Sequence, residues 1–533
     1  MNNDNRNLIL ALVLMTAVWF GFSLLFPSKP PQPVQENPPA AAAPVATASQ
    51  VLSNPAAPAP PLAATVAAKP REIVVETAKY QAVFSSTGAR LIAFELKEYR
   101  QEAAADSPRV ELVPRSSLRE ASLRTTATGS LALDADAPFM VERENALLQV
   151  AGGANESLIF RHVTASGVEV VKTFAFNGDD YRIDTSLAVR NTGNAALSGT
   201  IDLTLLQAWD PARKDSYSFS GPALLLGDSL EQIDVDDLEK GPKSFGQEAV
   251  WTSLQSKYFM MAAVPLAGAA EKIRVSHEGG LLLSSLQTPL LTLQAGERRQ
   301  FDYLLFFGPR DPEQLKVVGH GLDLAINFGW FDLLAKPLFH VLTFFYGYLH
   351  NYGWAIILLT VILKLIFWPL THKSYASMKA MQKLQPEMQK VRDKFKNDKE
   401  RLNKELMELY KKHSVNPLGG CLPMVVQIPV FFALYKVLLD AIALRHAPFM
   451  LWLTDLSAKD PYYITPLLMG ASMFIQQKMT PTTADPMQAK IFMFMPVVFT
   501  FLFLNFPSGL VVYWLVNNLL TIAQQYYINR RIT

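Results

Sequence analysis

The 533-residue chain contains few cysteines and few charged side chains. Cys421 is the single cysteine, so the chain can form neither an intramolecular disulfide nor a cysteine-based metal cluster. Asp, Glu, Lys and Arg together make up 18% of the residues, against roughly 25% in soluble proteins. Lys and Arg number 49 and Asp and Glu 47, so no global field attracts nucleic acid or acidic substrates. These shortages argue against an ordinary cytosolic enzyme.

Motifs for catalysis and metal binding are also missing. The eight histidines are scattered, without an HExxH pattern or a close pair, so we expect no zinc site. The sequence has no GxSxG element, no phosphate-binding loop and no dinucleotide fingerprint. We therefore expect no enzymatic activity and no cofactor.

Apolar residues are abundant instead, at 50% of the chain, and the mean hydropathy is +0.14. Leu8–Phe26 is a 19-residue apolar run, about 28 Å of helix and long enough to cross a bilayer. Proline-rich sequence follows it rather than a cleavage site, so we interpret residues 1–27 as an uncleaved signal-anchor helix; a cleaved signal peptide is the alternative. Residues 28–70 are rich in Pro and Ala and predict an extended linker.

Residues 71–327 predict a large all-β domain. Val168–Phe174 leads into an Asn-Gly-Asp-Asp turn, and Tyr181–Asp184 then alternates apolar and polar side chains before Asn191. Alternation with period two, bounded by turn residues, is typical of half-buried antiparallel strands. About 240 residues of this texture predict one β-sandwich domain.

The remaining sequence is apolar and predicts helices. Residues 328–350 mix aromatic and polar side chains, which is typical of an interfacial amphipathic helix. Residues 351–533 are expected to hold five membrane spans, which with the first apolar run make a bundle of six transmembrane helices. The five spans are expected at about Tyr352–Leu370, Gly419–Leu439, Tyr462–Gln477, Ile491–Asn505 and Pro507–Gln525.

The loop between the first two of these five spans is basic. Between Thr371 and Pro417 it carries 12 Lys and Arg residues and 6 acids, an excess that places it in the cytoplasm. Both chain termini are then cytoplasmic, and the β domain lies on the opposite side of the membrane. Apolar residues recur every three or four positions in residues 372–417, which predicts a helical hairpin, divided at Pro386. Its basic face is either simply solvated or docks to anionic lipid or ribosomal RNA.

Polar residues inside the spans are the candidate site. None of the predicted spans contains Asp or Glu, which argues against proton-coupled transport. Lys364 lies within an apolar span, with Thr360 one turn earlier, and either snorkels to the interface or lines a wet cavity. The last span carries a polar stripe that either bonds neighbouring helices or lines the same cavity. The stripe consists of Trp514, Asn517, Asn518, Thr521, Gln524 and Gln525.

Several short motifs then resemble the YidC/Oxa/Alb family of membrane protein insertases across the whole chain. They begin at Asn416 (NPLGGCLP), Gln427 (QIP), Asp460 (DPYY), Gln477 (QKM), Asp485 (DPM) and Phe506 (FPSG). The resemblance implies a periplasmic β-supersandwich domain and a five-helix core enclosing a groove open to cytoplasm and lipid. It places Lys364 where the family usually has arginine, with Thr360, Gln427 and Trp514 beside it. Lysine keeps the charge but loses the bidentate geometry of arginine.

The resemblance further implies insertion and folding of nascent membrane proteins in the bacterial inner membrane, without nucleotide, alone or with the Sec translocon and its accessory subunits. We assign the hydrophilic groove to Lys364, Thr360, Gln427, Trp514, Asn517, Asn518 and Thr521. We assign an apolar slide for client segments to Met424, Phe431, Phe499 and Phe503. Anionic lipids and the ribosome are further expected partners, the ribosome through the cytoplasmic hairpin, because no long basic tail follows Arg531.

Two rival functions differ in class. The β domain could be a tethered sugar-binding or sugar-isomerising domain with the helices as its anchor, although one helix would suffice for that. The second rival function is a channel for small solutes, which predicts ion conductance in bilayers.

Overall fold

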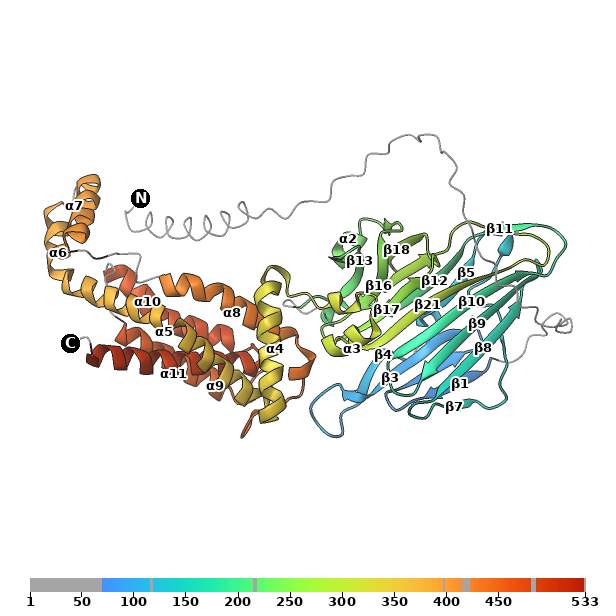
Figure 1. The fold of residues 1–533 in the computed structure, drawn as a ribbon, viewed down its shortest axis with the longest axis horizontal. Coiled ribbons are helices and arrows are strands. Elements are labelled where there is room, and N and C mark those ends of the chain that lie inside the picture. The colour runs from blue at the N-terminus through green and yellow to red at the C-terminus, as the bar shows by residue number, and fades with distance from the viewer. Residues whose placement is uncertain are drawn as a thin grey trace. The chain divides into compact units, whose positions relative to one another are not determined.

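The computed structural model describes residues 70–115, 118–213, 218–395, 398–413, 415, 422–480 and 486–531, all within one compact unit of residues 63–533. The predicted signal-anchor and nearly all of the predicted linker lie outside the described residues. Strands dominate as far as Pro309, and the chain is helical from Pro312 onward (Figure 1).

The strands form four sheets. Nine strands make the largest, in the order β14-β13-β16-β17-β21-β10-β9-β8-β6, and two five-stranded sheets have the orders β4-β3-β2-β1-β7 and β15-β18-β19-β12-β5. Strands β11 and β20 form a separate pair. In chain order the strands are β1 (Glu72–Glu76), β2 (Tyr80–Ser85), β3 (Arg90–Arg100), β4 (Arg109–Val113), β5 (Arg124–Ala127), β6 (Met140–Val141), β7 (Leu147–Gln149), β8 (Asn155–Val163), β9 (Val168–Asn177), β10 (Arg182–Asn191), β11 (Leu197–Gly199), β12 (Ile201–Ala208), β13 (Gly221–Leu226), β14 (Ser229–Gln232), β15 (Lys243–Phe245), β16 (Ala249–Gln255), β17 (Phe259–Leu266), β18 (Lys272–Glu278), β19 (Leu281–Gln287), β20 (Leu291–Leu293) and β21 (Arg298–Pro309). The predicted β-sandwich domain is therefore present.

Strand β9 shows why this sequence folds into a sandwich. Every second side chain of β9 is buried, Val168, Phe174 and Phe176 among them. β9 pairs antiparallel with β10 from Ile183 opposite Phe176 to Asn191 opposite Val168. A slip by one residue would turn the whole apolar row away from the core, so burial fixes this register.

Lys172 occupies one of these inward positions and is a buried exception to the apolar row. Its side chain is 1% exposed, and its ammonium donates to the backbone carbonyls of Ala89 at 2.7 Å, Leu123 at 3.0 Å and Gly88 at 3.4 Å. Burial, with a smaller contribution from the nearby Arg90 guanidinium, lowers the pKa of Lys172 to about 7. Three carbonyl dipoles thus replace a counter-ion in the core.

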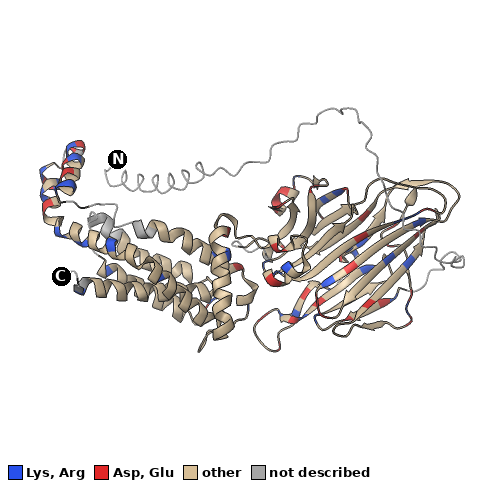
Figure 2. Cartoon of the chain, viewed as in Figure 1, with Lys and Arg blue, Asp and Glu red and all other residues tan. Residues whose placement is uncertain are grey.

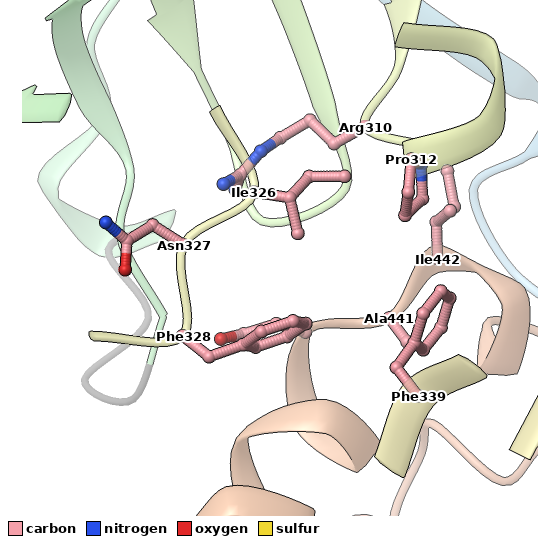
Figure 3. A pocket seen from close by; sticks show the side chains of 9 residues that line it. Arg310, Pro312, Ile326, Asn327, Phe328, Phe339, Ala441 and Ile442 are labelled. Carbon is pink, nitrogen blue, oxygen red and sulfur yellow. The ribbon is translucent and has the colours of Figure 1, made fainter. Parts of the chain in front are cut away.

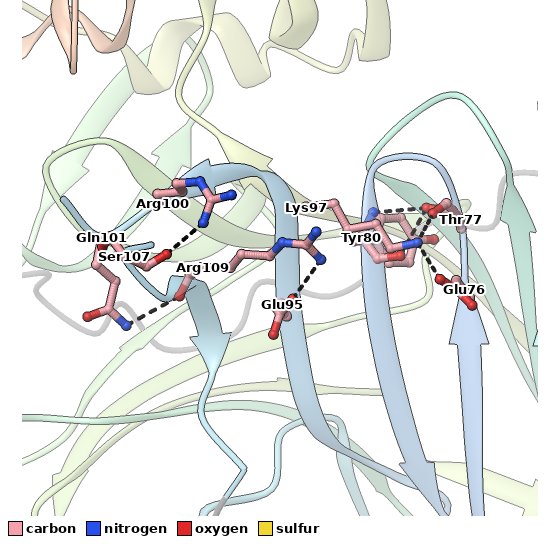
Figure 4. A network of polar contacts seen from close by, with 9 residues as sticks. All are labelled: Glu76, Thr77, Tyr80, Glu95, Lys97, Arg100, Gln101, Ser107 and Arg109. Carbon is pink, nitrogen blue, oxygen red and sulfur yellow. Dashed lines mark hydrogen bonds and ion pairs between the residues drawn. The ribbon is translucent and has the colours of Figure 1, made fainter. Parts of the chain in front are cut away.

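Ion pairs link the strands at the edge of the β1–β4 sheet (Figure 4). Lys97 donates to the Glu76 carboxylate at 2.8 Å and to the backbone carbonyl of Thr77 at 2.6 Å. The hydrogen bond from Lys97 lowers the pKa of Glu76, and its charge acts in the same direction. Arg109 pairs with Glu95 at 3.1 Å. Solvent reaches both pairs, so each contributes at most about 1 kcal/mol to stability.

Helices dominate the described residues after Pro309. They are α3 (Pro312–Val318), α4 (Asp332–Leu349), α5 (Tyr352–Lys383), α6 (Gln385–Lys394), α7 (Lys399–Lys412), α8 (Leu422–Asp440), α9 (Ile464–Met479), α10 (Pro486–Phe503) and α11 (Ser508–Arg531), and a single turn, α2 (Val235–Leu238), lies in the β domain. Helices α8, α9, α10 and α11 overlap the four later predicted spans, with ends that differ by at most six residues. The predicted interfacial helix corresponds to α4, which packs on α5 and α8.

Helix α5 is long and carries the candidate cation. The Asn351 side chain accepts a hydrogen bond from the Trp354 amide at 3.2 Å and caps its first turn. Its 32 residues make a rod of about 48 Å, with Pro369 inside it. Among the described residues, α5 alone is long and apolar enough to cross a membrane by length and composition; Phe492–Phe503 is a shorter apolar stretch.

The basic segment after α5 forms two short helices. α5 ends at Lys383 and α6 begins at Gln385, with Pro386 in its first turn, so the proline divides this arm. The Asp398 side chain caps α7 by accepting a hydrogen bond from the Arg401 amide at 3.0 Å. A small apolar core holds the two helices together. It consists of Met381, Leu384 and Met388, with Leu406, Leu409, Tyr410 and Val415 packed against them.

Candidate functional site

A small recess lies between three helices of the C-terminal region. α5, α8 and α11 all contribute side chains. The lining residues are Thr360, Leu363, Lys364, Phe367 and Thr371 from α5, Gln427 and Val430 from α8, and Tyr513 and Asn517 from α11. The α5 members lie three, four, seven and eleven residues after Thr360, which places them on one face of the helix.

Lys364 is the single charged group in the lining. Its side chain is half-buried, and its ammonium donates to the Thr521 hydroxyl at 2.7 Å. Thr521 in turn donates to the Asn517 backbone carbonyl at 2.6 Å, and the Gln427 amide donates to the Asn517 side-chain oxygen at 3.2 Å. No described Asp or Glu forms an ion pair with Lys364. The cation is thus held by neutral partners and keeps its electrostatic attraction for an anion.

Most of the predicted groove residues are near one another in the structure. Thr360, Lys364, Gln427 and Asn517 line the recess, and Thr521 bonds Lys364. Thr360 is 1% exposed, and its hydroxyl donates a hydrogen bond to the Ile356 carbonyl of the same helix.

The polar side chains predicted as one stripe on α11 point in two different directions. Asn518 points away from the recess and donates to the Ser472 hydroxyl of α9 at 3.2 Å. Gln525 donates to the backbone carbonyl of Met479, at the end of α9, at 2.6 Å. Asn518 and Gln525 therefore bond neighbouring helices, whereas Asn517 lines the recess.

Trp514 lies among aromatic rings rather than in the recess lining. Its ring centroid is 4.6 Å from that of Phe431, 5.1 Å from Phe503 and 6.1 Å from Phe499. Tyr513, the preceding residue, lines the recess. Trp514, assigned to the groove, and the three phenylalanines assigned to the slide thus form one aromatic cluster of α8, α10 and α11.

The residues assigned to the slide differ in exposure. Phe503 is only 4% exposed, and Phe431 and Phe499 are half-buried. Met424 belongs to α8, but its side chain lies outside the described part of the chain. More exposed apolar side chains on α8, which the assignment from the sequence did not include, are Val425, Ile428 and Phe432, exposed by 43–60%. On α10, Phe494, Val498 and Phe501 are exposed by 61–69%.

Sequence reasoning also passed over a second cation inside a predicted span. Lys436 lies within the span expected at Gly419–Leu439, and it pairs with Asp440 at 3.7 Å. The spacing of four residues was the available signal, because such pairs face each other on a helix. Lys436 therefore has a carboxylate partner, which distinguishes it from Lys364.

A second small hollow lies where the segment after β21 meets α4 and the end of α8 (Figure 3). Arg310 and Asp440 are its charged lining residues. The Arg310 guanidinium donates to three backbone carbonyls, that of Ala325 at 2.7 Å among them, and Asp440 accepts from Ser218 at 2.8 Å. Both charges have partners within the chain, so this hollow lacks the unpaired charge found in the first.

Charge is distributed unevenly over the chain (Figure 2). Basic and acidic residues are spread over the β domain and gather on α6 and α7, whereas α8, α9 and α10 are almost entirely uncharged. An apolar helical bundle with a cationic polar recess, joined to a large β sandwich, defines an integral membrane protein with an extramembrane domain.

Comparisons with known proteins identify the family. The "YidC periplasmic domain" matches residues 72–341, and the "60Kd inner membrane protein" family matches residues 344–533. A membrane protein insertase YidC of Geobacter metallireducens is 47% identical over 99% of this chain and 98% of the relative. That of Geobacter sulfurreducens is 46% identical over 99% of each chain. The chain therefore belongs to the YidC family of membrane protein insertases, and it is not an enzyme.

Two solved structures are similar to this chain. A crystal structure of an active YidC insertase is 19% identical to this chain and covers 86% of it and 92% of the insertase chain, with a TM-score of 0.38. A galactose mutarotase-like protein from Lactobacillus casei is 12% identical, with a TM-score of 0.32, and covers 44% of this chain and 99% of its own.

Proposed function

We propose that this protein inserts nascent membrane proteins by drawing a polar or acidic segment of the client into the recess around Lys364. The client is held there by the ammonium and the neighbouring hydroxyl and amide groups. Its hydrophobic segment leaves along the exposed apolar faces of α8 and α10 into lipid. Transfer of an acidic tail to the periplasm gains about 2.3 kcal/mol per charge per 100 mV of membrane potential.

The unpaired charge of Lys364 carries this proposal. A cation inside an apolar span costs about 2.5–3.5 kcal/mol on insertion scales, so such a charge marks a site of function. Its described bonding partner is the neutral Thr521 hydroxyl. An acidic side chain placed about 4 Å from the ammonium would gain roughly 1–4 kcal/mol, depending on how much water remains.

The charge distribution supports a proposed topology. The basic α6–α7 hairpin lies in the cytoplasm, the β domain in the periplasm and both termini in the cytoplasm, within the bacterial inner membrane. The hairpin contacts the ribosome or anionic lipid, and the chain works alone or beside the Sec translocon. Its charged surface favours such contacts (Figure 2).

The test is insertion into liposomes that contain the purified full-length protein. A small membrane protein with an acidic or a neutral tail is synthesised in vitro, and protease protection of the tail is measured under a membrane potential. We expect Lys364→Arg to insert both clients nearly normally, because the charge remains. Lys364→Glu should reduce insertion of the acidic tail about tenfold and of the neutral tail much less, because like charges repel.

Lys436→Met is the matched control, because Lys436 is a cation of the same bundle that pairs with Asp440 and does not line the recess. It should leave insertion of both tails unchanged. Equal insertion of acidic and neutral tails by Lys364→Glu would refute the electrostatic role. Deletion of residues 72–309 separates insertion from a sugar-related function, because only the latter requires the β domain.

A further inference from the structure

Gln524 is a buried residue of α11 whose side-chain amide has no partner. It is 2% exposed. Neither its Oε1 nor its Nε2 atom forms a hydrogen bond with any described part of the chain. In its neighbour Gln525 only the Oε1 atom lacks a described partner, because the amide nitrogen donates to the Met479 carbonyl. An unpaired amide in the interior destabilises the fold, so Gln524 does not serve as a bond between helices.

The position of Gln524 continues the recess face of α11. An α-helix turns by 100° per residue, so Tyr513, Asn517, Thr521 and Gln524 fall within an arc of about 80°. Gln525 lies 100° farther round the helix, toward α9. Gln524 is seven residues beyond Asn517, which is about 10 Å along the helix axis.

Contacts between α5 and α11 bracket Gln524. Lys364 bonds Thr521 on one side of it, and the rings of Trp368 and Tyr527 meet at 6.0 Å on the other. The amide is therefore located on the same seam as Lys364, displaced toward the α6–α7 hairpin.

We propose that Gln524 binds the peptide backbone of a client segment that extends from the recess along the seam between α5 and α11, an inference that rests on the proposed insertase function. A side-chain amide offers one acceptor and two donors, which complement the N–H and C=O of a peptide group. A polypeptide in apolar surroundings must find partners for these groups, because no water satisfies them there. Lys364 attracts the charge of the client, whereas Gln524 binds any sequence.

The experiment compares Gln524→Met with Gln525→Met in the full-length protein in liposomes. One client carries an acidic tail and the other a tail of Gly, Ala and Ser only, which contains no side-chain amide. We expect Gln524→Met to slow insertion of both tails about threefold to tenfold, the loss of one neutral hydrogen bond. Its midpoint of thermal unfolding in detergent should stay the same or rise, because an unpaired buried amide is removed.

Gln525→Met should give the opposite pattern, a lower unfolding midpoint with normal insertion, because it loses the bond to α9. Insertion of the Gly-Ala-Ser tail at the normal rate by Gln524→Met would overturn the backbone assignment. A fall in its unfolding midpoint that parallels slower insertion would overturn it too. Failure of the insertase function itself would be recognised separately, as no insertion by the unmodified protein.

A cross-link locates the client independently of rate. In a Cys421→Ser background, Gln524→Cys should react through a bis-maleimide with a cysteine in the client tail during insertion, and Gln525→Cys should react far less. Equal cross-linking at the two positions would contradict the orientation of α11 on which the proposal depends.

Discussion

The buried Lys172 of the β domain predicts a specific dependence of stability on pH. Burial lowers its pKa from 10.5 to about 7, so between these values the unfolded chain binds a proton that the folded chain lacks. The free energy of unfolding then rises with pH by about 1.4 kcal/mol per pH unit. From about pH 7.5 to 9 the gain is about 2 kcal/mol. Below about pH 7 both states are protonated, and this contribution is constant.

Urea denaturation of the full-length protein in detergent can measure this gain. Protease susceptibility of peptides from β9 and β10, scored by mass spectrometry, reports unfolding of this domain alone. Lys172→Met should abolish the rise in unfolding free energy with pH, because it removes the titrating group. Lys97→Met, at an ion pair that solvent reaches, should keep the rise. The reasoning is refuted if unmodified protein and Lys172→Met show the same change between the two pH values.

Two further predictions concern the helices. The Asp460 carboxylate accepts hydrogen bonds from the amide and the hydroxyl of Thr465, each at 2.7 Å, and from the Tyr462 amide at 2.9 Å. Burial would raise the pKa of Asp460, but these hydrogen bonds outweigh it and lower the pKa. Asp460→Asn should therefore cost about 2 kcal/mol and speed hydrogen exchange in the first turn of α9. A Cβ atom on Gly470 would lie 1.9 Å from the Thr500 hydroxyl. Gly470→Ala should therefore destabilise the protein by about 1–3 kcal/mol through overpacking and lower its thermal midpoint, and a second change, Thr500→Ala, should restore part of the loss. An unchanged midpoint would mean that α9 and α10 are not packed closely there.

Two strands and the all-β class of the domain were predictable from local sequence, but the arrangement of the strands was not. The alternation in Val168–Phe174 is a local signal, and it predicted a strand that the structure contains as β9. Sheet order depends on pairs that are distant in sequence. Strand β1, for example, pairs in parallel with β7, and Val74 lies opposite Leu147. No local pattern specifies such a partner, so the sequence predicted the β-sandwich class without its topology.

The candidate site was likewise predictable only in part. Lys364 could be found from the sequence because a charge within an apolar run is conspicuous. The choice between Tyr513 and Trp514, or between Asn517 and Asn518, could not be made. Adjacent helical residues point about 100° apart, and only the packing of α11 against α5, α8 and α9 decides which of each pair faces the recess.

Pro369 in α5 has a mechanical consequence. Proline cannot donate the hydrogen bond to the carbonyl four residues earlier, so the helix is weakest there, five residues beyond Lys364. The segment from Pro369 to Lys383 leads directly to the α6–α7 hairpin. Bending of α5 would therefore concentrate near Pro369, and a tilt of the segment that leads to the hairpin would leave the position of Lys364 unchanged.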